Sequence, residues 1–341
     1  MAVSAPPLPN FVAAPVTVRD QFGRQLRYLR VSVTDLCNLS CQYCNPAKGC
    51  PQTHPHKLSW DDLYFVADVA VRDLGVEAIR VTGGEPTVRP GLTEWIASIS
   101  TLPGLRDIAM TTNGILLGKL AQPLREAGLR RVNVSLDSFD EEKFRTLTRG
   151  GSLARCMEGI DRACDLFDRV KINCVLLRDV NSGEIEQFIR FSDERGIEVR
   201  FIELMPIFDQ KEFFHRHFIS VDEVKSLMAA RGMHLEADTA HGYGPATSFR
   251  VAGSRARVGF ISQMSDTKCL TCNKLRTTSD GSLKACLLSP QEIDLSPLIA
   301  ARDRDAFASA LRGSFLQRAE RYDLQQILSQ PVPRAMQAIG G

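Results

Sequence analysis

The stretch Leu29-Arg-Val-Ser-Val-Thr34-Asp-Leu-Cys37-Asn-Leu-Ser-Cys41-Gln-Tyr-Cys44 joins an alternating apolar run to a loop with three cysteines. Val31 and Val33 alternate with polar residues. This pattern predicts a strand with one apolar and one polar face, because side chains along a strand alternate between its faces. The same order of strand, loop and helix recurs from here to about Met205, and this repetition decides the fold class.

Six strand candidates alternate with helical stretches in this region. Such alternation predicts a parallel sheet with right-handed crossovers. The clearest helix spans 60–74: Ser59 is its N-cap, Asp62 completes a capping box, and Gly75 ends it. A second helix spans 185–195. The strand candidates are 29–34, 78–82, 107–111, 131–136, 170–176 and 198–203.

Polar residues recur on one face of these strands, which a sheet buried on both faces would not show. A closed eight-stranded barrel fills its interior with branched apolar side chains. We therefore predict an α/β fold built as a partial (βα)6 barrel of the TIM type, with a polar inner face around a ligand. The alternative, an antiparallel sheet with one solvated face, is disfavoured by the intervening helices.

The pattern changes after Met205, which predicts three parts of the chain. Residues 1–18 form a flexible lead-in with four prolines, and residues 19–205 form the barrel. Residues 206–341 form an α+β region, with a helix expected over 219–230 and paired short strands over 249–261. The last two residues are Gly340 and Gly341.

Composition and charge exclude several classes of protein. The chain has 341 residues, 44% of them hydrophobic, and a net charge of +2. This charge gives no global basic field for nucleic acid or a membrane surface. The sequence contains no apolar run of membrane-spanning length, and the N-terminus has no signal-peptide pattern. We expect a cytoplasmic protein whose core needs no structural metal.

The first cysteine triplet, Cys37, Cys41 and Cys44, has the spacing C-x3-C-x2-C. Three thiolates can hold three irons of a [4Fe–4S] cube and leave the fourth iron open to a small molecule. A zinc site is the alternative. It would need a fourth ligand, which Cys50, or His54 and His56, could supply.

The second triplet, Cys269, Cys272 and Cys286, has the spacing C-x2-C-x13-C and no neighbouring histidine. An isolated C-x2-C favours a zinc knuckle. Beside the first triplet, a second iron–sulfur cube with its own open iron is the better hypothesis. Three further cysteines, Cys156, Cys164 and Cys174, are expected to be ordinary buried thiols.

The first triplet, with Tyr43 directly before its third cysteine, resembles the signature of the radical S-adenosylmethionine (SAM) enzymes. Gly83-Gly84-Glu85-Pro86, after the second strand, resembles a segment of this family that meets the methionyl amino group. The resemblance implies a partial (βα)6 barrel, a [4Fe–4S] cluster and reductive cleavage of SAM to a 5′-deoxyadenosyl radical. The SAM contacts that it implies are Tyr43, Gly84, Ser135 and Met205.

The two triplets together resemble MoaA-type GTP 3′,8-cyclases, the first enzymes of molybdenum cofactor biosynthesis. The likeness covers the chain from about Leu29 to its end. It includes the segments 30–35, 80–86, 111–114, 133–137 and 272–276, and the final Gly340-Gly341. It implies hydrogen abstraction from the ribose 3′ carbon of GTP, attack on C8 of guanine, and a (8S)-3′,8-cyclo-7,8-dihydroguanosine triphosphate product. The second cluster would hold the guanine edge.

The resemblance also assigns substrate and catalytic residues. A buried triphosphate needs cations to meet it, and Arg30, Arg80 and Lys171 share the polar register of the strands. The implied catalytic residues are Arg276, Gly340 and Gly341. The implied GTP contacts are Arg30, Arg80, Thr111, Lys171, Lys274, Leu275 and Arg276.

Three residues depart from the family pattern. Lys274 and Leu36 each occupy a position where arginine is usual, and Lys268 occupies one where an aromatic residue is usual. A lysine offers a point charge where arginine offers a fork of donors, so substrate affinity is affected more than reaction type. The expected partners are GTP, an external electron donor and a downstream cyclic pyranopterin monophosphate synthase, with no nucleic acid or membrane. The sequence leaves a homodimer open.

Two alternatives remain at this level. One is another radical SAM enzyme with an auxiliary cluster, such as a peptide-modifying maturase, which would lack the cavity cations. The other is a metal-binding module without enzymatic activity, which would call for a basic surface.

Overall fold

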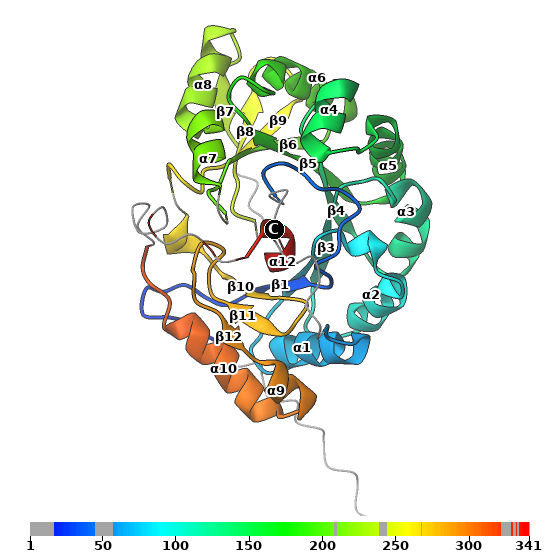
Figure 1. Cartoon of the computed structure of the whole chain (residues 1–341), viewed down its shortest axis with the longest axis vertical. Helices are drawn as coiled ribbons and strands as arrows, with labels where there is room; N and C mark the ends of the chain where they lie inside the picture. The colour runs from blue at the N-terminus through cyan, green and yellow to red at the C-terminus, as the bar shows by residue number, and fades with distance from the viewer. Residues whose placement is uncertain are drawn as a thin grey trace, which may run out of the picture.

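The computed structural model describes residues 17–44, 57–207, 210–238, 244–266, 268–321, 329, 332 and 334–340. Within these residues, twelve strands form one sheet in the order β12-β11-β10-β1-β2-β3-β4-β5-β6-β9-β8-β7. Figure 1 shows the sheet curving around a central space, with helices on its outer side. β12 and β7 are the edge strands of this described sheet, so the barrel stays open.

Six consecutive strands build the barrel wall, and each pairs in parallel with its neighbour. Helices on the outside connect them, as right-handed βα crossovers require. The strands are β1 (Tyr28–Ser32), β2 (Ala78–Thr82), β3 (Asp107–Thr112), β4 (Arg131–Ser135), β5 (Arg169–Leu176) and β6 (Glu198–Glu203). The helices are α1 (Trp60–Arg72), α2 (Leu92–Ser100), α3 (Leu117–Glu126), α4 (Glu141–Thr148), α5 (Leu153–Leu166) and α6 (Ile185–Arg195).

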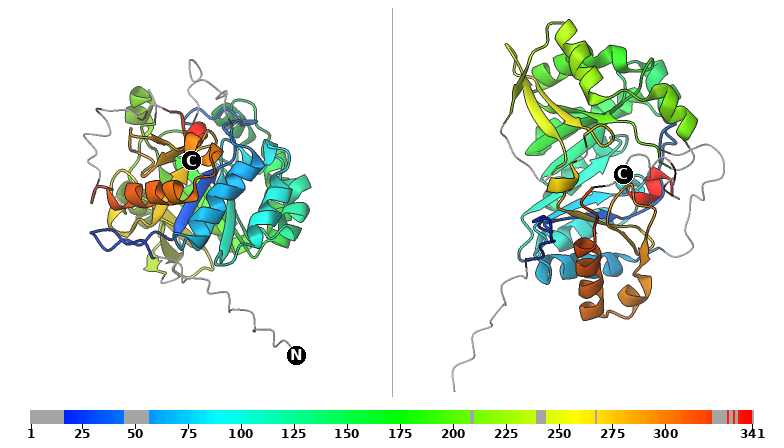
Figure 2. Two further views of the ribbon diagram at one scale, coloured as in Figure 1. Left: turned by 90° about the horizontal axis from the view of Figure 1, so that it is seen from below. Right: turned by 90° about the vertical axis from the view of Figure 1, so that its left-hand side faces the viewer.

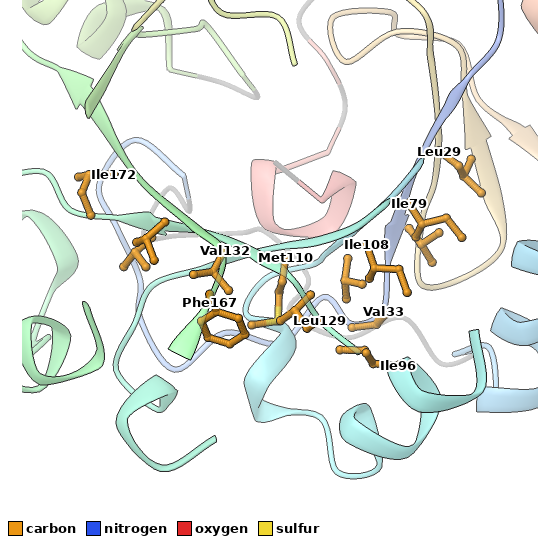
Figure 3. Close-up of a cluster of buried hydrophobic side chains, with 14 of the residues drawn as sticks. Leu29, Val33, Ile79, Ile96, Ile108, Met110, Leu129, Val132, Phe167 and Ile172 are labelled. Carbon is orange, nitrogen blue, oxygen red and sulfur yellow. The ribbon is translucent and has the colours of Figure 1, made fainter. Parts of the chain in front are cut away.

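The core lies between the sheet and these outer helices. Figure 3 shows apolar side chains of β2, β3 and β4, among them Ile79, Met110 and Val132, on the side of the sheet where Ile96 of α2 lies. These side chains are almost fully buried. The polar residues between them face the interior of the barrel. The alternation in the sequence therefore marks the two faces correctly.

The C-terminal region extends both edges of the same sheet. On one edge β9 (Arg257–Ile261) pairs in parallel with β6, followed by the antiparallel strands β8 (Thr247–Val251) and β7 (Leu235–Ala237). On the other edge β10 (Lys274–Thr277) pairs in parallel with β1, followed by β11 (Ser282–Lys284) and β12 (Ile293–Asp294). The parallel part of the sheet thus has eight strands, two more than the six expected.

Further helices belong to this region. α9 and α10 lie beside α1 (Figures 1 and 2), where Phe307 packs on Phe65 with ring centroids 5.4 Å apart. Arg304 forms ion pairs with Asp68 and Asp73 in the same contact. The helices are α7 (Lys211–His217), α8 (Val221–Ala230), α9 (Ser296–Ala300), α10 (Arg304–Leu316) and α12 (Met336–Ile339). The 3₁₀ turns are η1 (Pro86–Val88), η2 (Ser182–Glu184) and η3 (Cys269–Thr271).

The α/β class and the partial barrel are confirmed, with small differences at element ends. The Ser59–Asp62 capping box is present, but α1 ends at Arg72, before the expected Leu74. β1 ends at Ser32, because the chain turns into the cysteine loop after Val33. None of the helices in the described residues has the length and apolarity that a membrane crossing requires. The division at residue 205 remains a prediction, and residues 1–16 lie outside the described part.

Candidate active site

A cavity of about 250 Å³ lies inside the barrel, at the carboxyl ends of its strands. Ligands of parallel α/β barrels bind at this end, since the loops after the strands converge there. The cavity gathers most of the predicted site residues, although they come from distant parts of the sequence. Those that line it are Arg30, Cys37, Cys41, Tyr43, Cys44, Arg80, Gly84, Thr111, Ser135, Met205, Lys274 and Arg276.

The first cysteine triplet occupies the loop after β1. The backbone N–H groups of Ser40 and Gln42 donate to the carbonyls of Thr148 and Leu147, at 3.1 and 2.9 Å, which holds the loop against the end of α4. Burial raises the pKa of Cys37 to about 11, and burial together with the neighbouring Cys44 raises that of Cys41. Metal-free thiolates are therefore disfavoured here, and bound iron would stabilise them.

Tyr43 is held by a buried carboxylate. Its hydroxyl donates to Asp137 Oδ2 at 2.6 Å, and the N–H of Val175 donates to Oδ1 at 2.9 Å. Burial raises the pKa of Asp137 to about 6, although both donors oppose the shift. Asp137 follows β4 and Val175 lies on β5, so two strands fix the ring next to Cys44.

The Gly83-Gly84-Glu85 turn binds the cysteine loop by its backbone. The N–H of Gly84 donates to the carbonyl of Thr34 at 2.7 Å, and that of Glu85 to the carbonyl of Leu36 at 2.8 Å. A Cβ on Gly84 would lie 2.3 Å from the carbonyl oxygen of Leu36, so the approach requires glycine. The buried Glu85 carboxylate accepts from Thr112 Oγ1 and from the N–H of Asn113, at 2.8 and 2.6 Å. The turn thereby joins the ends of β1, β2 and β3.

Three guanidinium groups lie level with one another on adjacent strands. Arg30 of β1 is in register with Arg80 of β2 on one side and with Arg276 of β10 on the other. Burial and the Arg276 charge hold the pKa of Arg30 well below its usual range. Arg80 donates through Nε to the hydroxyl of Tyr28 at 2.6 Å, while its buried Nη1 has no hydrogen-bond partner among the described residues. Arg80 Nη1 can therefore donate a hydrogen bond to an anionic ligand.

Lys171 lies below this cavity and does not line it. Its Nζ pairs with Glu198 Oε2 at 2.5 Å, and the other oxygen of Glu198 takes Arg200 Nε at 2.6 Å. All three side chains are more than nine-tenths buried. Arg200 lines both the cavity and a smaller space beneath it, which Lys171 and Glu198 share. Lys171 is thus linked to the cavity through this ion-paired triad.

The second cysteine triplet gathers around the β10–β11 hairpin. Cys269 begins the 3₁₀ turn η3 before β10, and Cys272 follows that turn. The N–H of Cys272 donates to the carbonyl of Cys269 at 3.2 Å. Cys286 follows β11, and burial raises its pKa, with the neighbouring Cys272 and Cys269 acting in the same direction. Burial raises the pKa of Cys272, but the charges of Lys274 and Arg318 outweigh it and lower the pKa overall. Cys272 and Cys286 lie close enough to Arg276 to interact with its charge, and none of the three cysteines lines the cavity.

Arg24 supports the turn of the second triplet from the far end of the chain. It is paired with Asp20 at 2.5 Å and buried. Its Nη1 donates to the carbonyls of Cys269 and Ala319, at 3.1 and 3.0 Å. The N-terminal segment, the cysteine turn and the segment after α10 therefore share one guanidinium.

In the described part of the chain, no three histidine, cysteine, aspartate or glutamate side chains come together closely enough to hold one metal ion. A cube differs because each cysteine binds its own iron, which spreads the sulfur atoms apart. The three thiols of the first triplet can each bind one iron of such a cube. Cys50, His54 and His56 lie outside the described residues.

Comparisons with known proteins agree over nearly the whole chain. Residues 31–192 match the family model of the radical SAM superfamily, and residues 197–324 match that of Molybdenum Cofactor Synthesis C. A GTP 3′,8-cyclase of Alkaliphilus oremlandii is 41% identical, and the alignment covers 95% of this chain and 100% of that protein. The GTP 3′,8-cyclase of Geobacter sulfurreducens is 39% identical, over 94% and 99%.

The chain belongs to the GTP 3′,8-cyclase family. Membership of the radical SAM superfamily implies a [4Fe–4S] cluster and SAM. Among solved structures, Streptococcus suis SuiB bound to S-adenosylmethionine has a TM-score of 0.57 at 12% identity, covering 86% of this chain and 69% of that one. Native anSMEcpe with bound AdoMet has a TM-score of 0.55 at 14% identity, over 86% and 84%. These two likenesses concern the fold alone.

Besides Lys171 and the second triplet, the described residues Leu275 and Gly340 of this GTP 3′,8-cyclase family member do not line the cavity. The side chain of Leu275 is buried in the core on the other face of β10, so only its backbone remains for a substrate contact. Gly341 lies outside the described residues. Gly340 lies against β1 and β2, where an added Cβ would meet Ser32 and Thr82 at 2.9 Å. Its carbonyl accepts from Arg30 and Arg276, at 3.4 and 3.0 Å.

Sequence reasoning missed Arg200, Glu198 and Asp137. Arg200 could have been found, because Glu198, Arg200 and Ile202 continue the inward register on β6 that Arg30 and Arg80 show on β1 and β2. Asp137 gave a weaker signal, since it stands one residue beyond its strand. Its role depends on the loop of Tyr43 folding back onto it.

Proposed function

We propose that this chain converts GTP to (8S)-3′,8-cyclo-7,8-dihydroguanosine triphosphate, the first step of molybdenum cofactor biosynthesis. The main support for this proposal is the row of Arg30, Arg80 and Arg276 on three adjacent strands, in a cavity that the first cysteine triplet also lines. A triphosphate brings several negative charges, and burying them without cations would be very costly. The relatives named above carry this activity in their names.

The first triplet holds the [4Fe–4S] cluster, and the surrounding residues hold SAM. When bound, the cluster and SAM supply one-electron chemistry that removes a hydrogen atom from the substrate ribose. The residues of the chain position the cluster and SAM. Asp137 fixes Tyr43 beside the triplet, and the glycine turn brings backbone amides close to the cavity. The SAM contacts are Tyr43, Gly84, Ser135 and Met205.

The triphosphate meets the guanidinium groups of Arg30, Arg80 and Arg276 inside the cavity. Arg80 offers a buried Nη1, and Arg30 and Arg276 flank its strand from one side. Arginine is suited to this role because its planar fork meets two phosphate oxygens at once. Thr111, Lys274 and the backbone of Leu275 complete the substrate contacts, and Lys171 acts through its pairing with Glu198.

The second triplet, Cys269, Cys272 and Cys286, holds a second [4Fe–4S] cluster with an open iron toward the guanine. The support is the placement of Lys274 and Arg276 on the hairpin that joins these cysteines. Arg276 also holds the carbonyl of Gly340, so we assign Arg276, Gly340 and Gly341 to the cyclisation step. The three thiols would then hold the cluster near the base while the strand cations contact the phosphates.

The reaction balances with two electrons from outside. One electron would cleave SAM, and the deoxyadenosyl radical would leave as 5′-deoxyadenosine after taking one hydrogen atom from C3′ of the ribose. C3′ then bonds to C8 of guanine, and the second electron and one proton are added to the base. The product therefore has the mass of GTP. An external reductant must supply both electrons, and a cyclic pyranopterin monophosphate synthase must take the product. The described cysteines are free thiols, which fits a reducing compartment such as the cytoplasm.

The test is an anaerobic incubation with SAM, a reductant and GTP deuterated at C3′. We expect deuterium in 5′-deoxyadenosine and a product that separates from GTP but has the mass of unlabelled GTP, because a proton replaces the transferred deuterium. The protein should carry about eight irons per chain if both triplets hold four-iron clusters. Chromatography with mass analysis and metal analysis measure these results.

Two cysteine variants give the control. Cys41→Ser should abolish SAM cleavage, whereas Cys164→Ser should leave it unchanged because Cys164 lies on α5 outside the cavity. Zinc without iron, or deoxyadenosine formed with a peptide but not with GTP, would contradict the proposal. The first outcome would favour a metal module and the second a maturase.

A further inference from the structure

Residues 334–340, the tail, cross the mouth of the barrel. Figure 1 shows α12 in the central space, far from the outer helices. Ala335 and Ile339 are almost fully buried, and Gly340 has a positive φ of 77°. The carbonyl of Gly340 accepts hydrogen bonds from Arg30 and Arg276. The tail thus ends at the residues that we assign to substrate and catalysis.

A helix of four residues cannot hold this position by itself, because an isolated helix this short is unstable in water. Its place must come from side-chain contacts. Arg334, at the start of the tail, makes three such contacts to residues that the structure describes. Its Nη1 lies 2.8 Å from Asp280 Oδ2, its Nε lies 2.7 Å from Glu292 Oε2, and its Nη2 donates to Ser282 Oγ at 3.2 Å.

The partners of Arg334 are themselves fixed. Asp280 lies in the turn between β10 and β11 and accepts from Thr278 Oγ1. The second oxygen of Glu292 accepts from Lys284 Nζ at 3.0 Å, and this fully buried lysine also donates to the carbonyl of Ser289 at 2.8 Å. Buried charges that are paired and hydrogen-bonded in this way define one arrangement.

The same hairpin carries the residues that the tail reaches. β10 holds Arg276, and β11 leads directly to Cys286. Arg334 therefore fastens the beginning of the tail to the hairpin, and Arg276 of that hairpin receives its end at Gly340. The two contacts enclose α12 between them.

We propose that Arg334 is a positioning residue: an ionic latch to Asp280 and Glu292 that keeps the Gly340 carbonyl on Arg30 and Arg276. The inference rests on the proposed function of the tail. Lysine cannot replace arginine fully, since one ammonium group cannot reach both carboxylates and Ser282 in a fixed fork. The hairpin itself does not need the latch, because β10 pairs with β1 through the backbone.

The test compares Arg334→Gln and Arg334→Lys with the control Arg190→Gln, whose side chain is exposed on α6. In Arg334→Gln, amide exchange over 335–340 should rise about ten-fold or more, because the latch no longer opposes local opening. SAM cleavage should continue, while the ratio of 5′-deoxyadenosine to cyclised product rises by about ten-fold. In Arg334→Lys, the exchange rate and the ratio of 5′-deoxyadenosine to cyclised product should lie between those of the wild type and Arg334→Gln. Both quantities should be unchanged in Arg190→Gln. Iron content and melting temperature serve as checks of folding.

Unchanged exchange in Arg334→Gln would overturn the latch. Faster exchange with an unchanged product ratio would overturn the positioning role. If Arg334→Gln fails to fold, Arg334→Lys decides, and wild-type exchange and coupling in that variant would overturn the proposal. A wild-type enzyme that makes no cyclised product would instead contradict the proposed function, and the exchange comparison would still test the latch.

Discussion

Glu198 is a single carboxylate shared by two buried cations, Lys171 and Arg200. Its presence beneath a phosphate-binding cavity looks unfavourable, since it competes with the nucleotide for the same positive charge. Without it, however, two buried cations would face each other unpaired, which costs far more than a paired set. Glu198 therefore holds Lys171 charged, and it also limits how strongly the pair attracts phosphate.

This arrangement predicts how nucleotide binding depends on pH. Burial, and then the Arg200 charge, lower the pKa of Lys171 to about 8, while Glu198 opposes this shift. GTP affinity should fall as the pH rises through this value, because Lys171 loses its proton. Glu198→Gln removes the opposing charge, so the pKa of Lys171 falls further and the loss of affinity begins at lower pH. Below that range the variant should bind GTP roughly ten-fold more tightly.

Titration calorimetry of GTP from about pH 6 to about pH 9 measures both effects. Comparing the two proteins at each pH cancels the titration of GTP itself. Glu186→Gln is the matched control, because Glu186 pairs with Arg231 at the surface of α6. Superimposable pH profiles for wild type and Glu198→Gln would mean that Lys171 does not act on the bound nucleotide.

At the scale of elements, the loops after β1 and β2 behave as one unit. The backbone of Gly84 lies so close to that of Leu36 that neither loop can move without the other. The first loop carries the cysteines and the second carries the glycine turn. The shape of the SAM site therefore depends on a backbone contact and not on a side chain.

Gly84→Ala should disrupt this contact. The added Cβ would meet the carbonyl oxygen of Leu36 at 2.3 Å and that of Asp35 at 2.8 Å, and backbone atoms cannot move aside cheaply. We expect the free energy of unfolding to fall by about 1–3 kcal/mol, as for other overpacked sites. We also expect iron to be lost from the first triplet. Chemical denaturation and metal analysis measure the two effects.

The control is Gly313→Ala in α10, where an added Cβ has no atom within 4 Å. Alanine should stabilise this helix by about 0.5–1 kcal/mol and leave the iron content unchanged. Full iron in Gly84→Ala would show that the close approach of the two loops is not needed for the cluster.

Elements formed from local patterns were the ones that the sequence predicted well. The bounds of β2, β6 and α6 agree with expectation residue for residue, because alternation and a terminal Gly196 act over short distances. The pairings of β10 with β1 and of β9 with β6 were not predicted, since no local pattern states which distant strand joins an edge. The Lys171–Glu198 pair was missed for the same reason: it exists only because β5 and β6 place these residues in register.

Across the whole molecule, one sheet carries both cysteine triplets, the first at the carboxyl end of β1 and the second at the amino end of the parallel strand β10. The first follows β1, and the second flanks β10 and β11, which extend the edge beside β1. The chain therefore places residues more than 200 positions apart on neighbouring strands. The open edge of the barrel makes this possible, because a closed barrel of eight strands would leave no edge for the hairpin to join.

Because the hairpin is held by backbone pairing and by apolar contacts, the two triplets should be separable. Leu275 and Leu283 are almost fully buried, and β10 keeps its bonds to β1 whatever occupies the second site. Cys272→Ser should therefore leave a folded protein with about four irons per chain in place of about eight. SAM cleavage should persist at the first triplet, while cyclised product is lost because the guanine contact is gone.

Metal analysis and separate assays of 5′-deoxyadenosine and cyclised product distinguish this result from simple unfolding. Cys41→Ser should lose both activities, and Cys164→Ser neither. Wild-type iron in Cys272→Ser would mean that the second triplet holds no cluster. Loss of all iron would mean that the first cluster depends on the second. This would contradict the expectation that the pairing of β10 with β1 holds whether or not the second site is occupied. Partial iron with intact cyclisation would leave the second cluster without a role in catalysis, and the guanine would then have to be held by strand residues alone.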